Sequence, residues 1–158
     1  MTTTQRRRTR IALVAVVQLV LVGVAVAPRL SAYATGEEYL LRVAGLDPVD
    51  PFRGAYTQLD YPDLQLETRR TVEGEVFLLL EQQEDGTWRS TAMVTERPDH
   101  GPYLACEGGW RLSCGIESWF TSDDEARRLE AALAAGTGTA TVRIDSRGHA
   151  VLVDLVAG

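Results

Sequence analysis

The residue types that carry most enzymatic chemistry are scarce in this chain of 158 residues. It has two His, two Cys, and neither Lys nor Asn. Without Lys there is no Schiff-base lysine, P-loop lysine or Ser–Lys dyad, and without Asn there is no Cys–His–Asn triad. A His-based triad would need His100 or His149, whose neighbouring Pro and Gly residues favour solvated loop positions. The sequence therefore indicates no catalytic residue and favours a non-enzymatic protein.

Residues 46–61 contain the main candidates for a binding role, because Asp-Pro steps, an Arg, a Gly and two Tyr are concentrated there. Asp-Pro steps restrict Asp47 and Asp50 to extended conformations, and Gly54 offers a permissive φ before an expected strand. Arg53 lies between these constraints, where a structural salt bridge and a ligand contact both suit its chemistry. Several aromatic residues either line a pocket or belong to the core: Tyr56, Tyr61, Trp110, Trp119 and Phe120.

The N-terminus has the pattern of a membrane anchor. Four Arg within residues 6–10 precede an uncharged stretch, 11–28, in which Gln18 is the one strongly polar residue. A helix over residues 11–30 crosses the hydrocarbon core if Arg29 extends its charge outward. Arg residues before the span predict a cytoplasmic N-terminus. We expect a cytoplasmic tail at 1–10, an anchor at 11–30 and an extracytoplasmic domain at 35–158, held in the cytoplasmic (inner) membrane.

A cleaved signal peptide is the alternative to an anchor. Ala32-Tyr33-Ala34 fits the A-x-A cleavage pattern. The apolar stretch is longer than a usual signal-peptide core, and Pro28-Arg29 separates it from that pattern, so the anchor is favoured. Both interpretations export the domain.

The charge is divided sharply between the two parts of the chain. Residues 1–34 carry five Arg and no acid, a net charge of +5, whereas residues 35–158 carry eleven Arg and 22 acids, a net charge of −11. Nucleic acids bind clustered cations, so they are excluded as partners of this acidic domain.

Cys106 and Cys114 stand eight residues apart and flank the turn signal Gly108-Gly109. Two strands folded about that turn would bring the sulfur atoms together, and exported Cys pairs usually oxidise. We expect a disulfide, with two buried thiols as the alternative. A zinc site is disfavoured because two thiols do not complete its ligand shell and no His lies nearby.

The domain is expected to be mainly β (α+β), with a curled or barrel-like antiparallel sheet that protects its edges. One short helix is predicted from the capping box Ser122–Glu125 to a C-cap at Gly136. Alternating or continuous apolar stretches, with Asp85-Gly86 as a hairpin turn, predict strands at 38–46, 55–61, 75–82, 87–96, 139–145 and 149–156.

The octapeptide from Gly54 to Tyr61 resembles the signature of the GDYXXLXY family of bacterial membrane-anchored proteins. The similarity extends upstream through Gly36–Glu38 and 47–54, and downstream through Cys114–Phe120. Ala55 stands in place of the Asp that names the motif, so no role of that carboxylate is carried over. The resemblance marks as candidate interaction residues Asp50, Arg53, Gly54, Tyr56, Leu59 and Tyr61.

This resemblance implies a partner more than an activity, because the family is uncharacterised and its members tend to accompany multi-pass membrane proteins. We therefore expect a non-enzymatic anchored domain that binds or stabilises a multi-pass membrane partner or an envelope complex, without a cofactor or metal. Two alternatives stay open: a secreted or anchored domain that binds a small ligand, and a membrane-associated hydrolase without a recognisable catalytic set.

Alkaline carbonate extraction tests the anchor. The chain should stay in the membrane pellet, because about 20 residues in the hydrocarbon core hold a protein there. An antibody against the C-terminus follows the domain. A C-terminal fragment released into the soluble fraction would contradict the anchor and favour cleavage after Ala34.

Overall fold

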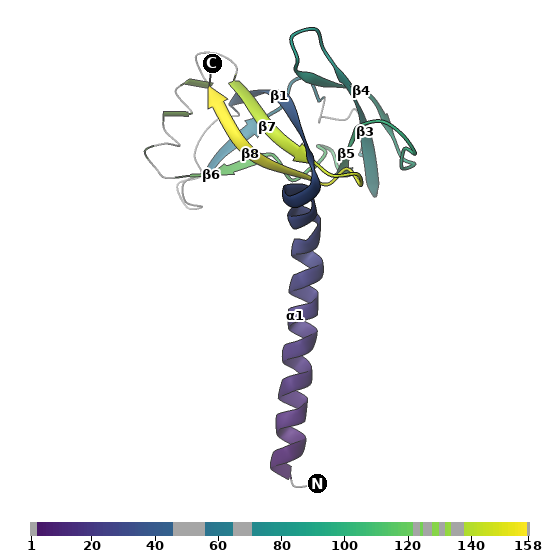
Figure 1. Cartoon of the computed structure of the whole chain (residues 1–158), viewed down its shortest axis with the longest axis vertical. Coiled ribbons are helices and arrows are strands. Elements are labelled where there is room, and N and C mark those ends of the chain that lie inside the picture. Colours follow the sequence, from purple (N-terminus) through teal and green to yellow (C-terminus); the bar gives the residue numbers. More distant parts are fainter. Residues whose placement is uncertain are drawn as a thin grey trace.

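The structure, a computed structural model, describes residues 3–45, 56–64, 71–121, 124, 128–129, 132–133 and 138–157. A long helix, α1 (Thr3–Thr35), projects from a β domain, with the N-terminus at its far end (Figure 1). Within it, Arg10–Thr35 contains an 18-residue stretch with a mean hydropathy of 2.6, none of which is buried inside the protein, so this part of the helix is long and apolar enough to cross a membrane. The expected long apolar helix is thus present, and it continues five residues beyond the predicted end of the anchor at Leu30.

Within the part of the chain that the structure describes, eight strands form one sheet. Their bounds are β1 (Glu37–Gly45), β2 (Tyr56–Asp60), β3 (Glu75–Gln82), β4 (Trp88–Val94), β5 (Tyr103–Glu107), β6 (Ser118–Phe120), β7 (Gly138–Ile144) and β8 (Ala150–Ala157). The mainly β class is confirmed, and most strands lie within one or two residues of their predicted positions. Thr95 and Glu96, predicted to end a strand, lie beyond β4.

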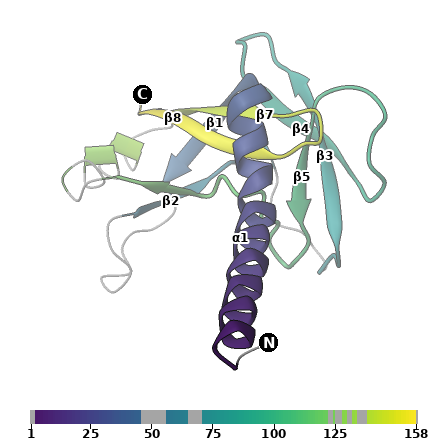
Figure 2. The same ribbon diagram turned by 60° about the horizontal axis from the view of Figure 1, so that its bottom comes forward.

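β1 is the branch point of the sheet. Glu37–Val43 pairs antiparallel with β7, Ala44–Gly45 with β2, and Leu41 meets Trp88 of β4 in a parallel bridge. The strand order is β5-β3-β4-β1-β2-β6, with β7 on β1 and β8 on β7. The sheet is therefore open and mixed, whereas the sequence predicted a curled or barrel-like antiparallel sheet. Figures 1 and 2 show β3, β4 and β5 on one side of the domain and β2 and β6 on the other.

The core follows from the strand patterns. The continuous apolar stretch of β3 is typical of a strand buried on both faces, and Val76, Phe77, Leu78 and Leu80 are buried there between β4 and β5. In contrast, β7 alternates buried and half-buried residues. The core is built from large, fully buried side chains of several elements. Among them are Tyr61, Leu41, Leu59, Leu64, Leu78, Leu104, Leu112 and Ile116.

The predicted short helix is described at five positions, and all five are helical: Asp124, Arg128, Leu129, Ala132 and Leu133. Leu133 is buried in the core and Leu129 packs against it, as their helical spacing predicts. Ser122, Glu125 and Gly136, the predicted caps, lie outside the described residues.

The hairpin predicted at the two cysteines is shorter than expected. β5 ends at Glu107, and a single antiparallel bridge joins Glu107 to Ser113. The backbone of Gly108 lies against that of Val72 and Gly74, so closely that an added Cβ would be 2.3 Å from the Val72 oxygen. This contact directs the chain away from a regular second strand.

Gly148 offers a test of the turn between β7 and β8. Its φ is +81°, and an added Cβ would lie 2.7 Å from the Tyr103 ring, whereas Gly86 has a similar φ of +85° and open space around it. Gly148→Ala should lower the free energy of unfolding by about 3 kcal/mol, and Gly86→Ala, the matched control, by about 1 kcal/mol. Chemical denaturation in detergent measures both. Equal losses would contradict the close approach.

Candidate functional site

The structure brings together the two segments that carry the signature pattern. β2 pairs antiparallel with β6, with Tyr56 opposite Phe120 and Gln58 opposite Ser118. Beside this pair, the Leu59 N–H donates to the Glu117 carbonyl oxygen at 2.9 Å. Residues some 60 positions apart in the chain therefore form one structural unit, here called the signature cluster (residues 56–61 and 111–120).

The signature residues within this cluster face the core. Leu59 and Tyr61 are fully buried, and the Tyr61 hydroxyl donates to the Ile116 carbonyl oxygen at 2.8 Å. Burial, and next the charge of Glu117, raise the pKa of Tyr61. Both side chains therefore position backbone segments. Tyr56 is described through its backbone alone, and Asp50, Arg53 and Gly54 lie outside the described residues.

Polar contacts and a disulfide close the signature cluster. The predicted disulfide between Cys106 and Cys114 is present. Arg111, between the two cysteines, forms an ion pair with Asp60 at 2.7 Å. The Glu117 carboxylate accepts the backbone N–H groups of Cys114 and Gly115. Sequence reasoning missed both partners: Arg111 meets Asp60 from 51 positions away in the chain, whereas the Glu117 contacts span only two and three residues and follow from a local turn.

Trp119 of the cluster and Trp110 beside it differ in exposure. Trp119 packs against the core, whereas Trp110, at the tip of the disulfide loop, is 71% exposed. An exposed Trp is typical of contact surfaces. The contacts described for the cluster itself are packing contacts, an ion pair, hydrogen bonds and a disulfide.

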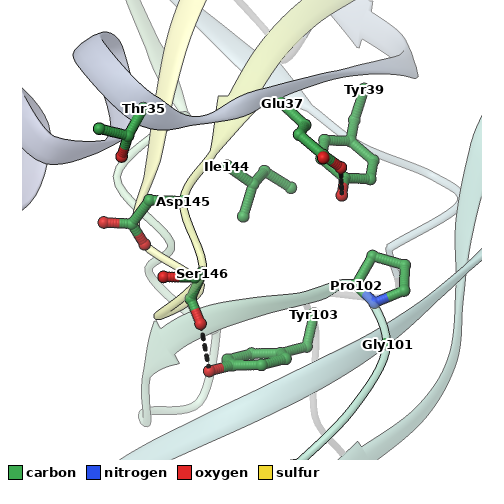
Figure 3. A pocket seen from close by; sticks show the side chains of 9 residues that line it. All are labelled: Thr35, Glu37, Tyr39, Gly101, Pro102, Tyr103, Ile144, Asp145 and Ser146. Atoms are coloured by element: carbon green, nitrogen blue, oxygen red, sulfur yellow. Dashed lines mark hydrogen bonds between the residues drawn. The ribbon is translucent and has the colours of Figure 1, made fainter.

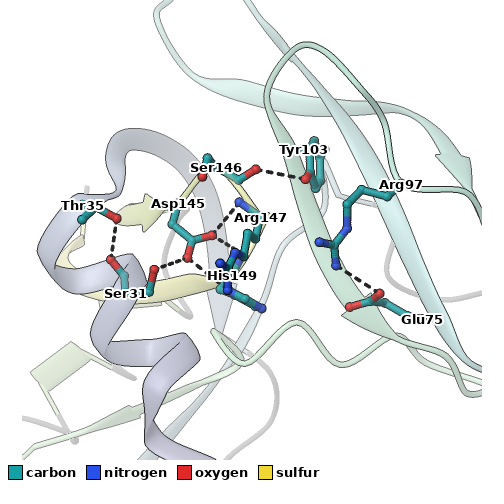
Figure 4. A network of polar contacts seen from close by, with 9 residues as sticks. All are labelled: Ser31, Thr35, Glu75, Arg97, Tyr103, Asp145, Ser146, Arg147 and His149. Carbon is teal, nitrogen blue, oxygen red and sulfur yellow. Dashed lines mark hydrogen bonds and ion pairs between the residues drawn. The ribbon is translucent and has the colours of Figure 1, made fainter. Parts of the chain in front are cut away.

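A second constellation lies where α1 meets the domain, and sequence reasoning missed it (Figure 4). Asp145, at the end of β7, has a side chain that is only 1% exposed. It accepts hydrogen bonds from Ser31 Oγ at 2.6 Å, from the backbone N–H groups of Arg147 and His149, and contacts His149 Nδ1 at 3.1 Å. With Arg143, the residues Ser31, Asp145 and His149 form the junction network.

The charge state of Asp145 reflects two opposing effects. Burial by itself raises the pKa of a carboxyl group, but the hydrogen bonds from Ser31, His149 and the backbone outweigh it. The pKa of Asp145 is therefore below its ordinary value of 3.8. The carboxylate stays ionised at neutral pH and binds the end of α1 to the domain.

Arg143 of β7 forms a second attachment between the sheet and the end of α1. Its guanidinium donates to the Tyr33 carbonyl oxygen and to the Gly36 carbonyl oxygen, the latter at 3.1 Å, and lies 5.9 Å from the Tyr33 ring centre. Gly36 is needed here, because an added Cβ would lie 2.4 Å from the Ala32 oxygen and 2.9 Å from the Ile144 nitrogen. The one residue between α1 and β1 is thus tightly packed.

Ser31, Asp145 and His149 are the residue types of a catalytic triad, but their connections differ. A triad requires the Ser hydroxyl to bond to His, and His in turn to Asp. Here Ser31 donates directly to Asp145, and His149 contacts the same carboxylate and not the Ser hydroxyl. His149, expected in a solvated loop, is instead half-buried against Asp145, because the turn folds it back onto the carboxylate.

A pocket of about 380 Å³ opens beside the junction network (Figure 3). It lies between the end of α1, β1, the start of β5 and the end of β7, and its lining residues are Thr35, Glu37, Tyr39, Gly101, Pro102, Tyr103, Ile144, Asp145 and Ser146. Among the described residues, no three His, Cys, Asp or Glu side chains are grouped so as to hold a metal ion.

A family model described as GDYXXLXY protein matches residues 18–155. No curated protein and no solved structure matches the chain. The family match includes the second half of the apolar helix as well as the β domain. It therefore covers both constellations and not the signature octapeptide alone.

Asp145→Asn tests the junction network. At neutral pH the variant should lose about 2 kcal/mol of stability, because a buried charged acceptor is removed. The lowered pKa means that this contribution is complete above pH 3.8 and is lost as pH falls through the folded-state value. Thermal unfolding in detergent should therefore show a gap from the wild type at pH 7 that narrows below pH 3.8.

Asp99→Asn, at an exposed loop position, is the matched control and should leave the pH 7 stability unchanged. A gap for Asp145→Asn that keeps its size down to pH 3 would contradict the role of the ionised carboxylate.

Proposed function

The chain belongs to the GDYXXLXY family, and from this premise we propose that it is a single-pass membrane protein whose β domain binds or stabilises a multi-pass membrane partner outside the cytoplasm. The domain acts without catalysis. The observation that carries the proposal is the rigid connection between the membrane helix and the sheet.

That connection contains one residue. α1 ends at Thr35 and β1 begins at Glu37, and Gly36 between them donates its N–H to Ala32 at 2.9 Å. A domain that needs only retention at a membrane can hang on a flexible linker. A fixed connection sets the height and rotation of the domain above the bilayer, which matters when one face must meet a partner held in the same bilayer.

The location of the domain is supported by two independent features. Arg residues before the span favour a cytoplasmic N-terminus, and the disulfide suits an oxidising compartment. Cleavage after Ala34 is disfavoured, because it would remove Ser31, which bonds to Asp145, and Ala32, which is fully buried. The mature domain needs both residues for its packing.

Gln18 supports a partner inside the membrane. It lies eight residues beyond Arg10, which is about 12 Å along the helix and so well within the hydrocarbon core. A side-chain amide in this environment gains from a hydrogen bond to another helix. A multi-pass partner offers such a helix at the depth of Gln18.

The hydrolase alternative gains no support from the junction. The Ser31 hydroxyl is engaged by Asp145 and not by His149, so the one Ser–Asp–His group among the described residues is not connected for nucleophilic attack. The ligand-binding alternative has a specific observation in its favour, the pocket beside the junction network.

A flexible Gly-Ser insertion between Thr35 and Gly36 tests the proposal. The wild-type chain should co-purify with a multi-pass membrane protein in mild detergent, and the insertion should abolish this capture by freeing the domain from the helix. The disulfide should still form, because Cys106 and Cys114 lie far from the insertion.

The matched control carries the same insertion between Asp85 and Gly86, in the exposed turn between β3 and β4, and should keep the partner. Mass spectrometry of the purified complexes gives the readout. A wild-type chain that is always monomeric and partner-free, or an insertion after Thr35 that keeps full capture, would refute the proposal.

A further inference from the structure

We propose that the pocket beside the junction network binds the primary ammonium group of a phospholipid headgroup, as in phosphatidylethanolamine. This inference rests on the membrane orientation in the proposed function, and it concerns a lipid site separate from the protein partner. The proposal is based on three features: the position of the pocket relative to the bilayer, the charge of its lining residues and the packing of its aromatic walls.

The pocket lies at headgroup height. Residues 11–30 measure about 30 Å as a helix, which equals the hydrocarbon core of a bilayer. The next five residues, Ser31–Thr35, add about 7.5 Å, the thickness of one headgroup layer. Thr35, the last residue of α1, lines the pocket. A lipid beside the helix therefore places its headgroup at this opening.

The lining selects for a cation. Its charged side chains are Glu37 and Asp145, and its other polar side chains are the hydroxyl groups of Thr35, Tyr39, Tyr103 and Ser146. No Arg or His lines this pocket. Two carboxylates without a lining cation repel anionic headgroups and attract an ammonium group.

Glu37 is the contact residue for the ammonium group. The Asp145 carboxylate is buried and already accepts hydrogen bonds from Ser31, Arg147 and His149. Glu37 is exposed, and its one hydrogen bond among the described residues comes from the Tyr39 hydroxyl at a long 3.4 Å. Its carboxylate has lone pairs left for a charged donor.

A primary ammonium group suits this site better than a quaternary one. It has three N–H donors, and Glu37 accepts one of them. The hydroxyl oxygens of Thr35 and Ser146 line the same pocket and can accept the others. A trimethylammonium group has no N–H donor, so it would leave these acceptors unpaired.

The aromatic walls of the pocket are held in place before a ligand binds (Figure 3). The Tyr39 ring packs edge-on against Trp88 with 4.9 Å between ring centres, and Tyr103 packs edge-on against Phe77 at 5.6 Å. The Tyr103 hydroxyl also donates to the Ser146 carbonyl oxygen at 3.1 Å. A preformed site loses little conformational entropy on binding.

Native mass spectrometry of the full chain in detergent micelles tests the site. Titration with phosphatidylethanolamine, phosphatidylcholine and phosphatidylglycerol should give the tightest binding for phosphatidylethanolamine. Glu37→Gln should weaken that binding roughly three- to tenfold, because it removes the charge but keeps the shape.

Glu38→Gln is the matched control. Glu38 is also exposed but points to the opposite face of β1, so its removal changes the net charge equally and should leave the lipid preference intact. Tyr39→Phe, which removes one hydroxyl and keeps the ring, should weaken binding less than Glu37→Gln does. An unchanged thermal unfolding profile confirms that each variant is folded.

Three results would overturn the proposal: equal binding of phosphatidylglycerol, equal losses in Glu37→Gln and Glu38→Gln, or no loss in Glu37→Gln. A further experiment uses soluble ethanolamine without lipid, and binding as tight as that of the lipid would refute a lipid source.

The titration uses the purified chain alone, so its failure leaves the partner proposal standing, and failed partner capture leaves the lipid site standing.

Discussion

The attachment of α1 to the sheet through Asp145 is the interaction on which the arrangement of this protein depends. A carboxylate that is only 1% exposed is costly to bury unless it is paired, and here the hydrogen bonds from Ser31, Arg147 and His149 offset that cost. The bond from Ser31 crosses 114 positions of the chain. It joins the end of α1 and the turn after β7, so the helix and the domain hold a fixed relative orientation.

The open, mixed sheet follows from the several roles of β1. It leaves the helix, pairs with β7 along most of its length, and then passes to β2 where β7 ends. Its bridge to β4 connects the β3–β5 group through Leu41, a core residue. β1 is therefore both the continuation of α1 and the branch point of the sheet.

The signature pattern is explained largely by packing. Leu59 and Tyr61 are buried, Asp60 pairs with Arg111, and Glu117 binds the backbone beside the disulfide. These residues hold two distant segments together, which is reason enough for their spacing. Among the described residues, an exposed Trp110 and the pocket beside the helix lie outside these packing contacts.

The sequence alone determined the features that depend on local pattern: the apolar helix, the charge division, the strand positions and the Cys106–Cys114 pair. These follow from hydropathy, turn residues and short separations along the chain. Only the tertiary structure decided that the sheet is open, that Arg111 meets Asp60, and that Ser31 and His149 meet at Asp145. The reason is physical, because the contacts of Arg111 with Asp60 and of Ser31 with Asp145 join residues 51 and 114 positions apart, and the four-residue contact of His149 with Asp145 depends on how the turn after β7 folds.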